Sequence, residues 1–225
     1  MTALPPFLAA GCAVLLLWLL RATWRSTRAR AAARAGYFAA VAPLFDRVTT
    51  RIAPTGFARM TGHIGPDGFD LQAVPDALTF RKLPALWVLV TLPGPLPLRA
   101  TLDIMARPTG QEPFSHFSQL PQSLPCPESL PPGTGLRSDD ATAVPPLERL
   151  APHLGLFADP KVKELVISPK GLRLVLLGDE ADRGRYLIFR DGEVGQTPLP
   201  PARLLPLLDA LRALRDDLTG KGAPA

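Results

Sequence analysis

The chain has 225 residues, of which 47% are hydrophobic, so it is long enough for one ordinary domain and is not wholly disordered. Its formal net charge of +5 is unevenly placed: eight arginines and one acid lie in the first 60 residues, and the rest is slightly acidic. A nucleic-acid-binding protein would carry its basic face on the folded body, so this distribution argues against nucleic acid as a partner.

The N-terminal segment predicts a membrane helix. Leu4–Leu20 contains no charged residue and would extend about 25 Å as a helix, against the ~30 Å thickness of a hydrocarbon core. Trp18, Arg21 and Trp24 fall where this helix would reach an interface, where aromatic rings and snorkelling arginines are favoured. We therefore expect residues 1–24 to form a single-pass transmembrane anchor.

Three other interpretations of this segment stay open. A cleaved signal peptide would carry positive charge before the apolar run, whereas here the arginines follow it. Cys12 and the small residues before it resemble a lipidation box, but the cysteine comes early and leaves Val14–Leu20 behind it. The remaining alternative is an apolar helix buried within a soluble domain, which the following arginines disfavour.

A basic stretch follows the apolar run and predicts its orientation. No basic side chain precedes the run, so the positive-inside rule places the N-terminus outside and the C-terminal domain in the cytoplasm, at the inner membrane of a bacterial cell. Each arginine near a bilayer with anionic headgroups contributes about 1 kcal/mol of attraction. The residues expected at the membrane interface are Trp18, Arg21, Trp24, Arg25, Arg28, Arg30 and Arg34.

The next segment is expected to be helical. Apolar residues recur at helical spacing from Phe38 to Ile52. We therefore expect a basic juxtamembrane helical segment over residues 25–60, a soluble α+β domain over 61–219 and a flexible tail over 220–225.

The first part of that domain predicts an antiparallel meander. Residues 65–68 (GPDG) are typical of a turn, and the alternation over 69–74 indicates a half-buried strand. A second strand is expected over 78–82. The continuous apolar run over 85–92 indicates a strand covered on both faces, and the alternation over 98–105 predicts its hairpin partner.

A proline-rich stretch over 108–132 separates this meander from the rest. Such a stretch is either a surface connection or a polyproline-II ligand for a partner. Phe114 and Phe117 lie within it and favour a segment that packs on the body. Beyond it, Ser138 or Asp139 is expected to cap a short helix.

The C-terminal part predicts a second meander and a final helix. Strands are expected over 163–168, 172–177 and 186–190. Residues 202–218 should form an amphipathic helix, because its leucines recur on one face; they are Leu204, Leu207, Leu208, Leu211, Leu214 and Leu218. The two meanders would be either the layers of a sandwich or halves of one mixed sheet.

No motif commits the chain to a reaction. His63, His116 and His153 lack metal-ligand spacing, and residues 179–182 lack the full ligand pattern of a calcium loop. We therefore expect no catalytic residue, no metal and no cofactor. Four arginines of the second meander either line an anion-binding surface or are solvated strand residues; they are Arg173, Arg183, Arg185 and Arg190.

These features favour a membrane-tethered, non-catalytic interaction or accessory subunit of a bacterial membrane-associated system. Its expected partners are an anionic lipid bilayer and a membrane or cytoplasmic protein. The alternatives are a membrane-associated domain that binds a small ligand or lipid, and an enzyme without a recognisable motif.

Overall fold

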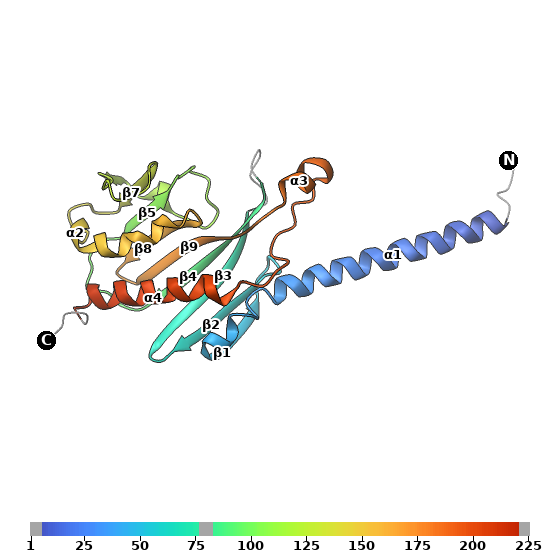
Figure 1. Ribbon diagram of the computed structural model, residues 1–225, viewed down its shortest axis with the longest axis horizontal. Coiled ribbons are helices and arrows are strands. Elements are labelled where there is room, and N and C mark those ends of the chain that lie inside the picture. The colour runs from blue at the N-terminus through green and yellow to red at the C-terminus, as the bar shows by residue number, and fades with distance from the viewer. Residues whose placement is uncertain (1–5, 77–82, 221–225) are drawn as a thin grey trace.

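The computed structural model describes residues 6–76 and 83–220, and the strand expected over 78–82 lies outside the described residues. A long helix, α1 (Pro6–Ala35), projects from one end of a body built on a β-sheet (Figure 1). Its 30 residues correspond to about 45 Å of helix. Within the described part of the chain, no helix has both the length and the apolar character needed to cross a membrane.

Nine strands of the described chain form one antiparallel sheet, in the order β1-β2-β3-β4-β9-β8-β5-β7-β6. Strands β4 and β9 join its two halves, so the alternative of a single sheet is confirmed over the sandwich, although the sheet is antiparallel throughout and not mixed. The strands are β1 (Asp46–Ile52), β2 (Ala58–Ile64), β3 (Asp67–Asp76), β4 (Ala85–Pro93), β5 (Leu102–Ala106), β6 (Gln122–Leu124), β7 (Thr134–Ser138), β8 (Val162–Ser168) and β9 (Gly171–Glu180). The expected α+β class is confirmed, with one large sheet and flanking helices.

The expected hairpin between residues 85–92 and 98–105 is wrong. Strand β4 pairs with β3 and β9, whereas β5 pairs with β7 and β8. The backbone amides of Gly94 and Leu96 donate to the carbonyl oxygens of Lys170 and Pro169 in the β8–β9 turn, at 3.0 Å each. With these bonds the chain crosses the end of the β8–β9 hairpin, so β5 pairs with β8 on the side opposite β9.

The helical stretch expected from Phe38 to Ile52 does not form, so the helical character expected over residues 25–60 is limited to the part up to Ala35 and a short 3-10 turn. A turn and a short 3-10 helix, η1 (Ala42–Leu44), follow, and then β1 begins. Pro43 lies in the first turn of η1, and Arg47 adopts a left-handed φ of 50° that no helix tolerates. Apolar residues of the turn, such as Phe38, are nevertheless buried in the core.

Two further expectations in the second half are corrected. Ser138 lies in β7, and the carboxylate of Asp139 accepts a hydrogen bond from the Thr101 amide at 2.7 Å, so neither caps α2 (Leu147–Leu150). The strand expected over 186–190 is instead part of a helix, α3 (Arg183–Phe189). The β8–β9 hairpin agrees with the expectation.

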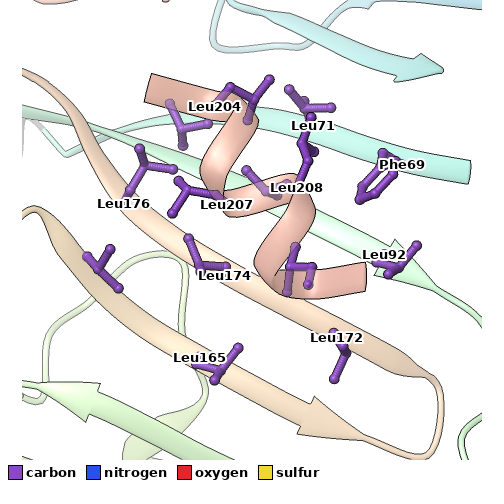
Figure 2. Packing of buried hydrophobic residues seen from close by; sticks show 14 of the residues in the cluster. Phe69, Leu71, Leu92, Leu165, Leu172, Leu174, Leu176, Leu204, Leu207 and Leu208 are labelled. Atoms are coloured by element: carbon purple, nitrogen blue, oxygen red, sulfur yellow. The ribbon is translucent and has the colours of Figure 1, made fainter. Parts of the chain in front are cut away.

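Helix α4 (Pro201–Leu218) covers one face of the sheet, and its six spaced leucines are buried as expected. Pro206 lies within the first turns of the helix and does not end it. Figure 2 shows the leucines of α4 against the strands; the labelled strand residues are Phe69, Leu71, Leu92, Leu165, Leu172, Leu174 and Leu176. Removal of these side chains from water is the main contribution to the stability of the packing between α4 and the sheet.

An ion-pair cluster fixes α4 to the β2–β3 turn. The buried carboxylate of Asp67 accepts a hydrogen bond from Arg212 Nε at 2.9 Å and others from Arg215. Burial by itself would raise the pKa of Asp67, but the hydrogen bonds and charges of Arg215 and Arg212 outweigh it and hold that pKa below its usual value. The turn expected over residues 65–68 thus also anchors the last helix.

Candidate functional site

Helix α1 is divided into an apolar half and a basic half. In the apolar half, consecutive side chains from Val14 to Leu20 are between 45% and 67% exposed, so every side of the helix faces away from the body. A helix that is apolar all round is normally buried in a core or in lipid. In the basic half, Arg21, Arg25 and Arg28 are exposed, and the Arg28 guanidinium lies 5.3 Å from the centre of the Trp24 ring.

The end of the basic half is fixed to the body. Arg30 Nη1 lies 2.5 Å from Glu193 Oε1, and the Arg34 guanidinium lies 5.7 Å from the centre of the buried Phe57 ring. Immediately after the helix, the Tyr37 carbonyl oxygen accepts a hydrogen bond from the Leu199 amide at 2.9 Å. The direction in which α1 leaves the body is therefore set by specific contacts.

Helix α3 carries the second exposed apolar group. The Asp182 carboxylate caps it by accepting a hydrogen bond from the Arg185 amide, and Arg190 ends it with a left-handed φ of 54°. The tip side chains Leu187, Ile188 and Phe189 are 61%, 73% and 73% exposed. Exposed apolar groups of this kind mark contact surfaces.

The four arginines expected as one anion-binding surface are not brought together. Arg183, Arg185 and Arg190 belong to α3 and its C-terminal cap, and all three are exposed. Arg173 is half-buried on β9, and its positive charge partly offsets the burial that raises the pKa of Asp103, which belongs to a different cluster. The four arginines therefore do not form one surface: three lie on or next to α3, and Arg173 lies apart from them on β9.

A buried acid cluster lies on the face of the sheet away from α4. Asp103 of β5 is paired with Val166 of β8, and Val166 is paired with Arg173 of β9. Glu164 precedes Val166 by two residues and lies on the same face of β8. Asp103 and Glu164 are only 2% and 1% exposed, which is exceptional for carboxyl side chains.

The proline-rich segment covers this cluster. The Ser115 hydroxyl donates a hydrogen bond to Glu164, and the Phe117 amide donates to the Ser115 oxygen at 3.0 Å. Phe114 is buried with its ring centre 5.0 Å from that of Trp87. The expectation that this segment packs on the body is confirmed for Phe114 and Phe117.

The surroundings raise the pKa values of both buried acids. Burial, followed by the charge and hydrogen bond of Glu164, raises the pKa of Asp103 to about 9. Burial raises the pKa of Glu164 to about 7, against the opposing effects of Ser115 and Arg173. One oxygen of each carboxyl group has no hydrogen-bond donor among the described residues. Both shifts favour the protonated form, and a proton shared by the two carboxyl groups would supply the donor that these oxygens lack.

A cleft of about 230 Å³ opens beside the cluster. Lys163 Nζ lies 3.2 Å from Glu112 Oε1 at its wall and donates to the carbonyl oxygens of Ala106 and Arg107. Further lining residues include Trp87, Thr109, Gln111 and Glu180. Asp103 and Glu164 are not among the residues that line this cleft.

The sheet has an open edge at β1. In the order of the described strands, β1 has β2 on one side and no strand on the other. All seven residues of β1 are exposed, and Val48 and Ile52 are 37% and 57% exposed. An exposed edge strand offers unpaired backbone groups to an added strand.

No known protein-family model, curated protein or solved structure matches this chain. The function is therefore argued from these surfaces alone. Sequence reasoning missed the acid pair, because Asp103 occupies the polar side of an alternating strand and looks solvent-facing. The signal that could have found it is the pair of phenylalanines in the proline-rich segment. They need a face of the sheet to pack on, so the face that carries Asp103 would be covered.

Proposed function

We propose that this protein is a membrane-tethered, non-catalytic interaction subunit of a bacterial membrane-associated system. In this proposal the apolar half of α1 inserts in the inner membrane, the arginines lie at its cytoplasmic face, and the body holds a protein partner in the cytoplasm. The proposal rests on the expected single-pass anchor, whose uncharged run begins at Leu4, before the first residue of α1.

The observation that carries the proposal is the division of α1. Its apolar side chains are exposed on every side of the helix, whereas Arg30 and Arg34 contact the body. A soluble helix would leave this apolar surface in water at a free-energy cost of about 25 cal/mol per Å². Lipid removes that cost, and the fixed base of the helix then holds the body at a defined place on the membrane.

The partner surface that we assign is the open edge of β1. Strand addition there would satisfy backbone donors and acceptors along the strand, and Val48 and Ile52 would supply apolar contacts. The bulge between Asp46 and Thr49 shortens the regular part of this edge, so the partner strand pairs with the second half of β1.

Site-specific crosslinking in native membranes tests this function. A photoreactive benzoylphenylalanine at Thr50 of β1 should give one crosslinked protein product in the membrane fraction, and the same group at Glu148 of α2 should give none. Ile52→Lys should remove the product, because it places a charge on the half of the edge that the partner strand pairs with, and Leu205→Lys on the exposed side of α4 should leave it. Recovery of the free monomer from both positions would contradict the proposal.

A second candidate function is binding of a small ligand, which the cleft beside Lys163 and Glu112 favours. A paired lysine and carboxylate next to Trp87 can orient a polar ligand with a flat apolar part. A thermal-shift screen of the full chain in detergent tests it. A saturable shift that Gln111→Ala weakens would favour this candidate, and no shift with any metabolite would count against it.

A further inference from the structure

We infer that α3 is a second membrane contact, whose apolar tip enters the headgroup region of the same bilayer that receives α1. The inference rests on the proposed membrane tether and extends it to a part of the body. Its partner is a lipid surface that contains anionic headgroups.

Position is the first argument. Figure 1 shows α3 at the end of the body from which α1 projects, while α2 and the C-terminal end of α4 lie at the opposite end. The ion pair between Arg30 and Glu193 ties the segment after α3 to the basic half of α1. Membrane helices are tilted by about 20° on average. If the molecule leans toward the side that carries α3, the tip of α3 moves closer to the headgroups.

The chemistry of the tip is the second argument. Leu187, Ile188 and Phe189 are exposed in sequence, with arginines on both sides of them. Apolar side chains that enter the acyl boundary, with arginines that reach back to phosphates, form the usual pattern of an interfacial helix.

The charges around α3 indicate that insertion of its apolar side chains contributes more to membrane binding than attraction to anionic headgroups does. Two acids accompany its three arginines, and both are engaged: Asp182 caps the helix, and Asp191 accepts a hydrogen bond from Arg185 Nη2 at 2.7 Å. Arg190 lies 5.7 Å from the centre of the Tyr186 ring. Anionic lipid should therefore strengthen the contact modestly, and the apolar tip should decide whether it forms.

The loop conformation also supports a surface role. The Arg185–Asp191 ion pair and the left-handed Arg190 close α3 on itself, so its three apolar tip residues are presented outward by a defined turn. A helix this short buries them on no neighbour in the described structure, where each remains at least 61% exposed.

The test places an environment-sensitive fluorophore on the full chain in bilayers with and without phosphatidylglycerol. Three single-cysteine proteins are compared: one that keeps Cys12 and has Cys126→Ser, and two that have both natural cysteines replaced by serine and carry Ile188→Cys or Glu148→Cys. Doxyl groups near the headgroup or near the chain end of the lipid report depth by quenching. A probe at a protein interface is not quenched by lipid.

We expect the probe at position 188 to be quenched several-fold more by the shallow doxyl group than by the deep one. The probe at Cys12 should show the reverse order, and the probe at position 148 should not be quenched. Adding Leu187→Ser and Phe189→Ser should abolish quenching at position 188, whereas adding Leu205→Ser on the exposed side of α4 should leave it unchanged.

Two failures are distinguishable. If position 188 behaves like position 148 while Cys12 is quenched, the α3 contact is wrong and the tether stands. If Cys12 is not quenched either, the tether itself is wrong, and the inference fails with it.

Discussion

The buried pair Asp103–Glu164 should make the stability of the body fall as pH rises. A carboxyl group whose pKa is raised on folding keeps its proton where the unfolded chain has lost it, so each such group lowers stability by about 1.4 kcal/mol per pH unit between its unfolded and folded pKa values. Asp103 has its pKa raised from 3.8 to about 9. One proton retained from pH 6 to pH 8 gives an upper bound of roughly 3 kcal/mol, and local relaxation brings the expected loss to roughly 1–3 kcal/mol.

Asp103→Asn tests this reasoning, because the amide donates to Glu164 at every pH and replaces the shared proton. Urea unfolding of the full chain in detergent, followed by the fluorescence of Trp87, gives the free energy at each pH. Between pH 6 and pH 8 the variant should lose at least about 1 kcal/mol less than the unaltered protein. Asp209→Asn makes the same substitution on a side chain that is 74% exposed, and its stability should depend on pH as that of the unaltered protein does. Equal slopes for all three proteins would refute the shared proton.

Three further predictions concern the core and its ion pairs. Leu208→Ala should lower the free energy of unfolding by about 2–5 kcal/mol, because Leu208 is buried. Leu205→Ala should change it little, because Leu205 is 41% exposed. Urea unfolding measures both variants. Asp67→Asn should destabilise by about 1–3 kcal/mol at pH 7. Since the pKa of Asp67 is lowered on folding, this contribution exists above the unfolded pKa and is lost as pH falls, so the two proteins should converge in acid melts. Gly178→Ala should cost about 1–3 kcal/mol, because its Cβ would lie 2.6 Å from Tyr37 Oη, and a melting temperature equal to that of the unaltered protein would contradict the packing.

The sequence predicts those parts of the fold that depend on short-range pattern. The leucine spacing of α4 and the alternation around the β8–β9 turn are local signals, and both elements form as expected. The pairing of β4 with β9 joins residues that are far apart in the sequence, and no local pattern encodes which strands meet. This pairing decides that the body is a single sheet.

The segment from Tyr186 to Phe189 shows how context overrides propensity. Its aromatic and branched residues are typical of a strand, but β9 continues to Glu180 and Asp182 then caps a helix. Similarly, Asp103 alternates like a solvent-facing residue until the proline-rich segment covers that face. The division of α1 could be predicted from the sequence, whereas the exposed tip of α3 and the acid pair required the structure.

The placement of the body relative to the membrane is the central claim, and the two natural cysteines test it in the unaltered protein. Both are exposed in the structure, so any protection of Cys12 comes from its surroundings in the membrane. Partial desolvation raises the pKa of the Cys126 thiol, and its labelling rate in detergent therefore serves as the reference.

The measurement is labelling by a membrane-impermeant maleimide in right-side-out cells and in inside-out vesicles, with mass spectrometry to locate the modified residue. The account predicts that Cys126 reacts only in inside-out vesicles and that Cys12 reacts only after detergent is added. Labelling of Cys126 from outside the cell would contradict the cytoplasmic orientation. Labelling of Cys12 in sealed membranes at the rate seen in detergent would contradict the membrane anchor.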